Sequence, residues 1–274
     1  MTVRDLLVDA TRELERAGVP SPRVDAEWLL AHALGVSRSQ LYTNGDEAPA
    51  EKARFFRELV ARRAKREPLA YVLGEWGFRR LTLRIDPRVL IPRPETEVLV
   101  ERCLELLAGV AEPRVLDVGV GSGAIALAIV DEHPGARVVA TDSSADALAV
   151  AAENAARTAL PLELVQGELF AGVEGPFDLV VSNPPYVALH EVDSLPAEVA
   201  EHEPRSALID SGETDAIAEQ ALARLVPGGS LALEVADGKA QLIAERLRGL
   251  GYEEVTIGED LAGRERVVDG RAPR

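Results

Sequence analysis

From residue 97 to the end of the chain, short runs of β-branched and leucine residues alternate with stretches of helical periodicity. Strands are predicted over 114–121, 137–144, 162–169, 177–185 and 229–236, and helices over 97–107, 124–133, 145–158, 214–226 and 240–251. Parallel strands need a crossover between them, so this rhythm predicts a parallel sheet covered by helices on both faces. The last two runs, 252–260 and 264–271, lack an intervening helix and predict an antiparallel hairpin at the sheet edge. The pattern indicates a doubly wound α/β protein.

The N-terminal part has a different pattern. Its apolar residues follow helical stripes, and Gly35 is placed where a helix should stop. After Gly74 apolar residues occupy every second position, which predicts a short β-hairpin. We therefore expect a helical domain over 1–73, a hairpin linker over 74–90 and an α/β domain over 91–274.

Composition excludes several classes of protein. The 274 residues are 47% apolar and 28% charged, which is ordinary for a folded globular chain. A single cysteine, Cys103, cannot form an internal disulfide, and the four histidines lack the spacing of metal ligands, so we expect no metal site. No segment has the length of apolar sequence that a membrane span needs, and the N-terminus does not have the pattern of a secretory signal. We expect a cytoplasmic protein without a membrane partner.

Charge is unevenly distributed along the chain. Residues 1–85 hold 15 Lys and Arg against 12 Asp and Glu, whereas the remainder holds 15 against 34. A phosphate backbone is repelled by such an acidic segment, so we expect no stable binding of nucleic acid. The basic cluster Arg62, Arg63, Lys65 and Arg66 is interpreted as a solvated helix face.

A glycine-rich turn joins the first predicted strand of the α/β domain to its helix. It runs Asp117-Val118-Gly119-Val120-Gly121-Ser122-Gly123. Glycines allow a tight turn and a close ligand, and the helix N-terminus offers free N–H groups. Gly121 to Ala126 also fits the dinucleotide fingerprint, which would indicate a nicotinamide or flavin enzyme. Asp117 favours a cationic cofactor without a pyrophosphate, because a site that binds pyrophosphate gains nothing from a carboxylate at this position.

Asp142 ends the next predicted strand, where a carboxylate can accept hydrogen bonds from both hydroxyls of a ribose. Each of these features has a simpler interpretation. The glycine turn can be only a tight connection, Asp142 can be the N-cap of the next helix, and paired prolines can simply end a strand. Their joint occurrence after neighbouring strands favours a nucleoside-binding site.

The run Asn183-Pro184-Pro185-Tyr186 follows the fourth predicted strand of the domain. The Asn side-chain carbonyl and the next backbone carbonyl can accept both hydrogens of one planar NH2 group, and the prolines stiffen this pair of acceptors. Amide and aryl amine nitrogens are poor nucleophiles, and these acceptors bind more strongly as positive charge develops on the nitrogen. Tyr186 would stack on the planar group and exclude water. S-adenosylmethionine is the matching electrophile, since it is cationic and carries a ribose.

With these motifs, the sequence resembles the class I S-adenosylmethionine-dependent methyltransferases, and more closely the release-factor glutamine methyltransferase (PrmC/HemK) family. The resemblance extends to residues 68–74, the run 90–97 (Leu-Ile-Pro-Arg-Pro-Glu-Thr-Glu), Glu203-Pro204 and residues 260–266. It implies a Rossmann-like, seven-stranded, mostly parallel sheet with its last strand antiparallel, and a small N-terminal helical domain that recognises the substrate. It also implies a monomeric enzyme that methylates N5 of the glutamine in the Gly-Gly-Gln motif of class I peptide chain release factors, which belongs to translation termination.

The resemblance also assigns residues to roles. Asp117, Gly119 to Gly123 and Asp142 would contact S-adenosylmethionine. Asn183 would lie between cofactor and substrate, and Asn183, Pro184, Pro185 and Tyr186 would bind the glutamine amide, with Asn183, Pro184 and Tyr186 as catalytic residues. Glu168 and Leu169 occupy the place of an acid and an aromatic residue beside the adenine; Leu169 retains apolar contact there but not π-stacking.

Two further groups have open interpretations. Arg93, Glu95 and Glu97 either line the substrate mouth or only form a favourable helix N-terminus. Acidic residues that follow Tyr186 are interpreted as a surface that steers a basic substrate loop; they are Glu191, Asp193, Glu198, Glu201 and Glu203.

Two other functions remain as alternatives. An adenine or guanine amino-methyltransferase acting on DNA or RNA would hold an exocyclic amine with the same Asn-Pro-Pro-Tyr run. A regulator that binds release factors or the cofactor without turnover would not need Asn183. Net charge disfavours the first, and the presence of Asn183 disfavours the second.

Overall fold

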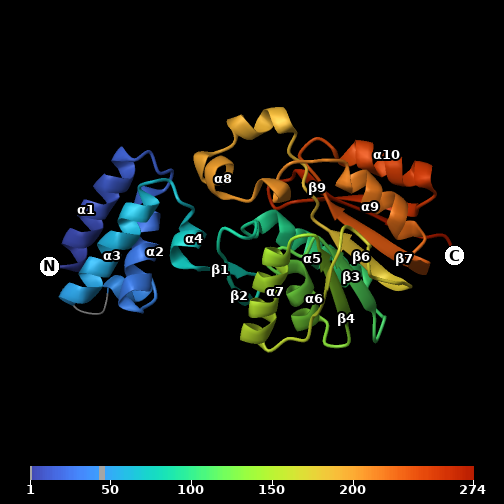
Figure 1. Ribbon diagram of the computed structural model, residues 1–274, viewed down its shortest axis with the longest axis horizontal. Coiled ribbons are helices and arrows are strands. Elements are labelled where there is room, and N and C mark those ends of the chain that lie inside the picture. Colours follow the sequence, from blue (N-terminus) through green and yellow to red (C-terminus); the bar gives the residue numbers. More distant parts are fainter. Residues whose placement is uncertain (1, 43–46) are drawn as a thin grey trace. The chain divides into compact units, whose positions relative to one another are not determined.

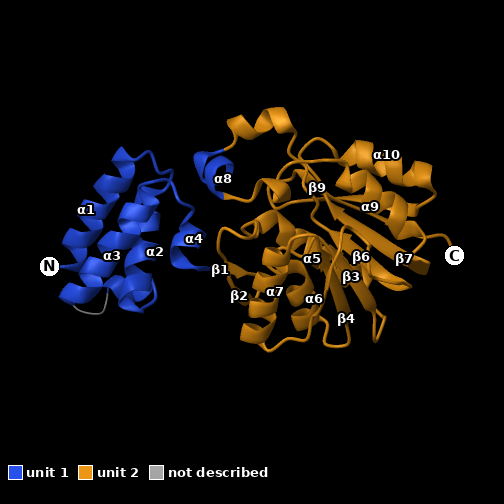
Figure 2. Cartoon of the chain, viewed as in Figure 1, with its two compact units in different colours: residues 1–75, 196–202 blue, residues 76–195, 203–274 orange. Residues whose placement is uncertain are grey.

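The computed structural model describes residues 2–42 and 47–274. Contacts divide the chain into two compact units, shown in Figure 2: residues 1–75 with 196–202, and residues 76–195 with 203–274. Residues 196–202 are flanked in the sequence by the second unit, but their contacts place them in the first.

The first unit is helical. It contains α1 (Val3–Arg16), α2 (Pro22–Leu34), the 3-10 turn η1 (Ser39–Tyr42), α3 (Ala50–Arg63), α4 (Leu69–Leu73) and α8 (Ala197–His202). The Thr2 hydroxyl caps α1 by accepting from Asp5 N–H at 3.0 Å, and Gly35 ends α2 in the left-handed conformation, as its position predicted. The stripe of leucine and alanine on α1 is buried in the core of this unit.

The basic cluster on α3 is not a solvated face, because Arg63 is buried. Its side chain is only 5% exposed, and its guanidinium donates to Asp25 on α2 and to Glu198 on α8. Arg66 also pairs with Glu198, at 2.6 Å. The interpretation of this cluster as fully solvated is therefore wrong for Arg63, since two carboxylates from distant parts of the sequence enclose it.

The second unit is built on a seven-stranded sheet in the order β5-β4-β3-β6-β7-β9-β8 (Figure 1). The strands are β3 (Arg114–Val118), β4 (Arg137–Asp142), β5 (Glu163–Gln166), β6 (Phe177–Ser182), β7 (Leu225–Glu234), β8 (Glu253–Glu259) and β9 (Glu265–Arg271). Only β9 runs against its neighbours, so the expected antiparallel last strand and edge hairpin are confirmed. A separate two-stranded hairpin, β1 (Glu75–Phe78) with β2 (Leu81–Arg84), agrees with the period of two after Gly74.

Helices cover both faces of this sheet. They are α5 (Pro94–Leu106), α6 (Ala124–Glu132), α7 (Ala145–Thr158), α9 (Glu213–Leu222) and α10 (Ala240–Leu250), with the short helical turns η2 (Leu189–Ser194) and η3 (Arg205–Ala207). Leu116 and Val118 of β3 join a buried cluster with α9 and α10. The alternate residue Asp117 points to the opposite face, where it meets the start of α6. The predicted α/β architecture is thus confirmed.

Every strand that precedes a motif ends earlier than the apolar run suggested. The strands β3, β4, β5 and β6 end at residues 118, 142, 166 and 182, two to three residues before the predicted ends. The glycine turn, Glu168, Leu169 and the Asn-Pro-Pro-Tyr run therefore lie in loops. Because the strands are parallel, these loops all lie at the carboxyl edge of the sheet.

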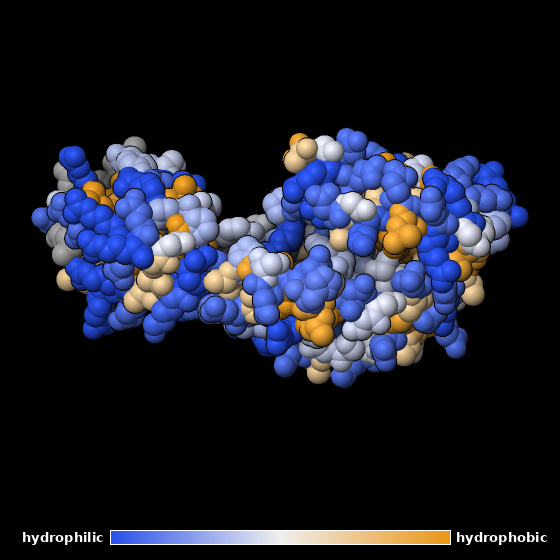
Figure 3. Space-filling model, turned by 90° about the horizontal axis from the view of Figure 1, so that it is seen from above, coloured by the Kyte–Doolittle hydropathy of each residue, from blue (hydrophilic) through white to orange (hydrophobic). Residues whose placement is uncertain are grey.

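The surface is mainly hydrophilic on the face drawn in Figure 3, and hydrophobic residues form small scattered groups there. None of the helices within residues 2–42 and 47–274 has both the length and the apolar character that crossing a membrane would require.

Candidate active site

A cavity of about 780 Å³ lies at the carboxyl ends of β3, β4, β5 and β6. This volume is in the range of ligand pockets in proteins. Strand order reverses at β3, whose neighbours β4 and β6 follow it on opposite sides, and such a switch point is where open α/β sheets bind ligands. Every residue that lines the cavity belongs to the second unit.

The glycine turn forms one wall of this cavity. Gly119 and Gly121 have φ of +81° and +52°, and a Cβ built on either would meet no atom within 4 Å. Both glycines line the cavity together with Val120 and Ser122, so their bare backbone is what a ligand would approach. The turn is held from behind, because the N–H groups of Gly119 and Val120 both donate to Thr141 O at 2.9 Å.

Gly123 and Asp117 do not line the cavity. Gly123 is the N-cap of α6 with φ of +85°, a conformation that favours glycine, and a Cβ there would lie 3.1 Å from Leu127 Cδ1. Asp117 is fully buried, and its Oδ2 accepts from Ala126 N–H at 3.1 Å. Burial raises the pKa of Asp117 to about 7, although the Ala126 hydrogen bond opposes the rise. Its geometry fits a residue that fixes the start of α6 behind the glycine turn.

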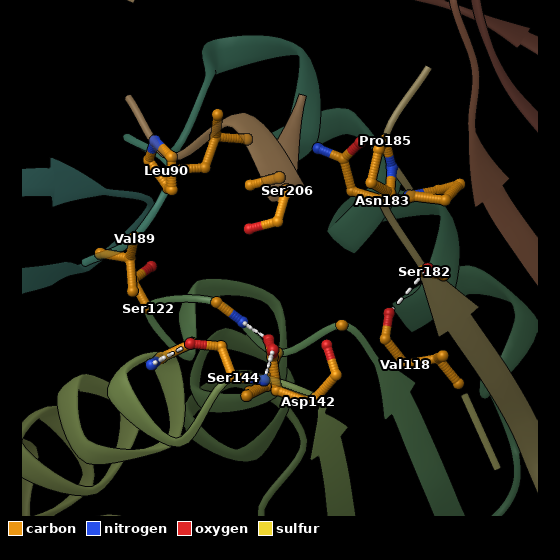
Figure 4. Close-up of a pocket in the computed structure, with 18 of the residues that line it drawn as sticks. Val89, Leu90, Val118, Ser122, Asp142, Ser144, Ser182, Asn183, Pro185 and Ser206 are labelled. Atoms are coloured by element: carbon orange, nitrogen blue, oxygen red, sulfur yellow. Dashed lines mark hydrogen bonds between the residues drawn. The ribbon is translucent and has the colours of Figure 1, made fainter. Parts of the chain in front are cut away.

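Asp142 ends β4 at the cavity wall. Its Oδ2 accepts from Gly121 N–H at 3.0 Å and its Oδ1 from Ser144 N–H at 2.9 Å (Figure 4). Ser144, and not Asp142, is the N-cap of α7, since its hydroxyl accepts from Ala147 N–H. The helix-cap interpretation of Asp142 is therefore wrong. Each carboxylate oxygen keeps a lone pair with which a ligand hydroxyl in the cavity can be bound.

Glu168 and Leu169 follow β5 and line the same cavity. Leu169 adopts φ of +51°, and its carbonyl accepts from Thr141 Oγ1 at 2.7 Å. This bond holds the loop after β5 against the end of β4. The Leu169 side chain is half-buried, which suits an apolar contact with a flat ring.

The Asn-Pro-Pro-Tyr run starts directly after β6. Asn183, Pro184 and Pro185 line the cavity, across from Asp142 and Ser144 in Figure 4. The preceding Ser182 donates to Val118 O at 2.7 Å, which ties the end of β6 to the end of β3. The structure thus places the two motifs that were predicted to bind an amide and a nucleoside on one cavity.

Tyr186 lies beside the cavity and is not one of its lining residues. Burial raises the pKa of the Tyr186 phenol, and the nearby Glu234 carboxylate adds to the rise. The phenol therefore stays neutral near pH 7.

Sequence reasoning missed Thr96 and Glu234, two residues that contact Asn183. Thr96 lies in the first turn of α5 and accepts from Asn183 Nδ2 at 3.2 Å. Glu234 ends β7, is 1% exposed, and lies beside Thr96 and Asn183, whose side chains act to lower the pKa of its carboxyl group. The signal was the parallel register, since β6 and β7 pair Ser182 with Leu233 and so bring the next residues of both strands together.

The run before α5 has divided roles. Arg93 lines the cavity and pairs with the buried carboxylate of Glu203. Burial raises the pKa of Glu203, whereas Arg93 opposes the rise. Glu95 pairs with Arg264, and Glu97 accepts from Arg79 N–H, and neither lines the cavity. Of these three residues, only Arg93 therefore fits the interpretation that they line the mouth of the substrate site.

Two residues must be removed from the proposed steering surface. Glu203 is buried against Arg93, and Glu198 is enclosed by Arg63 and Arg66 of the helical unit. Their charges are neutralised by these arginines, so they cannot attract a partner. The exposed acids of the segment are Glu191, Asp193 and Glu201.

No group of three or more His, Cys, Asp and Glu side chains that could hold a metal ion occurs in the part of the chain that the structure describes. Cys103 is buried in α5, and burial strongly raises the pKa of its thiol. It fits a small apolar core residue.

Comparison with known proteins gives consistent results. Residues 5–74 match the PrmC N-terminal domain model, and residues 94–244 match the methyltransferase small domain model. The release factor glutamine methyltransferase of Deinococcus radiodurans is 46% identical over 99% of both chains, and that of Rhodopirellula baltica is 42% identical over 97% of this chain and 95% of the relative. Among solved structures, a T. thermophilus 16S rRNA N2 G1207 methyltransferase with AdoMet and guanosine is 21% identical, with a TM-score of 0.54 over 72% of this chain and 49% of that one, which is a likeness of fold. On its full-length identity to these relatives, the chain belongs to the release factor glutamine methyltransferase family.

Proposed function

We propose that this protein transfers the methyl group of S-adenosylmethionine to N5 of the glutamine in the Gly-Gly-Gln motif of class I peptide chain release factors. One observation carries the proposal: Asn183 and Pro184 share a cavity with the glycine turn and Asp142. A planar amide and a nucleoside cofactor can therefore be held side by side. The names of the full-length relatives support the choice of glutamine as the amide and of a release factor as its carrier.

The residues present fit the cofactor. The open side of Gly119 and Gly121 admits a ligand against the backbone, and Asp142 has lone pairs free for two ribose hydroxyls. We assign Gly119 to Ser122 and Asp142 to this ligand, with Leu169 and Glu168 at its adenine. Asp117 and Gly123 support the turn from behind. When bound, S-adenosylmethionine supplies a methyl group on a cationic sulfur, which a neutral nitrogen can attack.

The glutamine amide nitrogen is a weak nucleophile, and the residues of this chain assist its attack. The Asn183 side-chain oxygen and the Pro184 carbonyl accept the two N–H bonds of the glutamine amide, and these bonds strengthen as the nitrogen loses its planarity and gains positive charge. Pro184 is buried and Pro185 follows it, so the acceptors are held in place before the substrate arrives. Tyr186 stays neutral and keeps water from the amide.

We assign residues 1–73 to recognition of the release factor, 74–90 to the linker and 91–274 to catalysis. The match of residues 5–74 to a family-specific N-terminal domain supports the first assignment. We further propose that the enzyme works as a monomer and does not bind nucleic acid stably, which the acidic balance of residues 86–274 supports.

A single labelling experiment tests the function. Radiolabelled S-adenosylmethionine is incubated with the protein and a purified class I release factor, with the same factor carrying Gln→Ala in its Gly-Gly-Gln loop, with duplex DNA and with total RNA. We expect label on the intact factor alone. Label on nucleic acid alone would replace this proposal by the amino-base methyltransferase, and cofactor binding without any transfer would support a regulator.

A further inference from the structure

The surroundings of Asn183 are unusual for a residue that must accept hydrogen bonds from a substrate. Its side-chain nitrogen donates to Thr96 Oγ1 at 3.2 Å, and the carboxyl group of Glu234 lies close enough to both side chains for them to lower its pKa. Thr96 and Glu234 are almost fully buried, at 4% and 1% exposure. The three side chains therefore lie together in one buried polar group.

Counting donors fixes the orientation of the amide. A carboxylate can only accept, so the group that Asn183 turns toward Glu234 must be its NH2. The Thr96 hydroxyl accepts the other N–H of Asn183, which leaves its own hydrogen to be donated toward the carboxylate. A reversed amide would place its oxygen against a buried carboxylate, which costs the desolvation of both groups. Both N–H bonds of Asn183 are therefore committed, and the amide oxygen is the acceptor left for a ligand.

We propose that Glu234 and Thr96 are positioning residues for methyl transfer, which lock the Asn183 amide with its oxygen available to the substrate NH2 group. This inference rests on the proposed function, in which that oxygen accepts from the glutamine. Glu234 does not line the cavity, whereas Thr96 lines it, and we assign Thr96 to Asn183 rather than to the substrate. A freely rotating amide would present the wrong end to the substrate for part of the time.

The charge state of Glu234 matters to this lock. The titratable side chains around it are Glu95 on α5, Arg266 on β9 and Tyr186 after β6. Burial raises its pKa to about 7, and the hydrogen bond from Thr96 is the largest opposing effect. Its Oε2 has no hydrogen-bond partner among the residues that the structure describes. Protonation would give this carboxyl a donor of its own, so the lock should loosen as the pH falls through about 7.

The composition of the chain offers a direct test that needs no substrate. Only three asparagines occur, at positions 44, 154 and 183, so asparagine labelled with 15N in its side chain gives three NH2 signals in an NMR spectrum of the full-length protein. Asn154 is an internal control, because it is buried and its NH2 donates to two backbone carbonyls, Arg84 O and Ser122 O. We expect the Asn183 signal to shift between about pH 6 and 8 while the Asn154 signal stays in place.

Variants assign this shift to its source. In Glu234→Gln the Asn183 signal should no longer move with pH, whereas in Glu95→Gln it should still move. An unchanged titration in Glu234→Gln would overturn the lock, and an unresponsive Asn183 signal in the wild type would overturn its pH dependence. This readout holds whether or not the protein methylates a release factor.

Kinetics test the consequence of the lock. Glu234→Ala and Thr96→Val should each lower kcat, the first on the order of 10²-fold, with little change in the Kd of S-adenosylmethionine. Wild-type kcat should decline as the pH falls through about 7, and Glu234→Gln should lose that decline. Asp269→Asn is the matched control, since it removes a buried carboxylate on β9 that pairs with Arg102, away from Asn183.

The outcomes separate this inference from the proposed function. An active wild type with unaffected Glu234→Ala and Thr96→Val variants would overturn the positioning role alone. An inactive wild type whose Asn183 signal still follows Glu234 would overturn the release factor as substrate and leave the lock supported. Equal losses of kcat in Asp269→Asn and Glu234→Ala would show that both variants act only by destabilising the fold, and would overturn the positioning role.

Discussion

At the residue scale, we assign Asp142 two tasks that a substitution would remove together. It accepts from the Gly121 N–H, and it lines the cavity in which we place the ribose. We expect Asp142→Ala to weaken S-adenosylmethionine binding on the order of 10²-fold, because hydrogen bonds to a charged acceptor contribute about 1.5 to 3 kcal/mol each. Calorimetric titration of the cofactor measures this change. An unaltered Kd would show that the ribose is bound elsewhere.

Asn183 lines the same cavity, but we assign it to methyl transfer rather than to cofactor binding. Asn183→Ala should retain S-adenosylmethionine and lose methyl transfer on the order of 10³-fold, which is the effect of removing one preorganised polar contact to a developing charge. The comparison of cofactor Kd with single-turnover rate separates the two tasks. If the variant kept its rate, the acceptor pair assigned to the amide would be wrong.

The residues that sequence could identify are those that stand in local motifs. Gly119, Gly121 and Asn183 follow a strand and Asp142 ends one, and a parallel sheet places such residues at one edge. Thr96 and Glu234 escaped notice because their importance lies in contacts with Asn183, which is 87 positions away from Thr96 along the chain. Glu234 also looks like an ordinary acid at the end of a strand until its 1% exposure is known.

At the scale of elements, α8 packs with the N-terminal helices although it lies more than 100 residues after them in the sequence. It is only six residues long and contains no buried residue, so its own hydrogen bonds cannot stabilise it. Glu198 attaches it to the helical unit by pairing with Arg63 and Arg66. Burial raises the pKa of Glu198, but the hydrogen bonds from Arg66 and Arg63 outweigh burial and lower it to about 2.

This attachment predicts a loss of protection in α8. Glu198→Gln should raise amide hydrogen exchange across residues 197–202 and destabilise the protein by about 2 kcal/mol, less than the 3 to 5 kcal/mol for breaking a fully buried pair. Because the folded pKa is lowered, the wild-type contribution should be complete above about pH 4.5 and lost as the pH falls toward 2. Glu201→Gln, at an exposed position of the same helix, is the control. Equal exchange in the two variants would contradict the attachment.

Periodicity predicted which elements exist better than where they end. The helix expected over 214–226 ends at Leu222, and β7 begins at Leu225, because Leu225 pairs with Phe177 of β6 across the sheet. The helix α3 ends at Arg63, whose guanidinium pairs with carboxylates of α2 and α8. Tertiary partners decided these boundaries, and a single sequence does not contain them.

At the scale of the whole molecule, charge and contact divide the chain at similar places. Residues 1–85 carry a small positive excess and the remainder a large negative one, and the contact division falls between Glu75 and Trp76. Within the acidic part, the exposed acids after the Asn-Pro-Pro-Tyr run are the best placed to act on an approaching partner, since they follow the amide-binding residues directly. A basic partner would be attracted over a distance set by salt.

Steering by these acids predicts a salt-dependent rate. Raising the salt concentration from about 0.1 to about 1 M shortens the screening length from ~10 to ~3 Å, so kcat/KM for a release factor should fall while kcat changes little. A triple variant, Glu191→Gln, Asp193→Asn and Glu201→Gln, should start from a lower kcat/KM and lose less of it with salt. Initial rates at low substrate concentration, measured across the salt series, test both expectations.

The control must change the net charge equally at another place. Glu163→Gln, Glu245→Gln and Glu253→Gln remove three exposed acids from β5, α10 and β8. Glu163 and Glu253 stand at the first residue of their strands; β5 runs parallel to its neighbours, so Glu163 lies at the edge of the sheet opposite the glycine turn. If this variant lost salt dependence as fully as the first, the attraction would come from net charge alone. If neither variant differed from the wild type, association would be governed by contacts rather than by long-range charge.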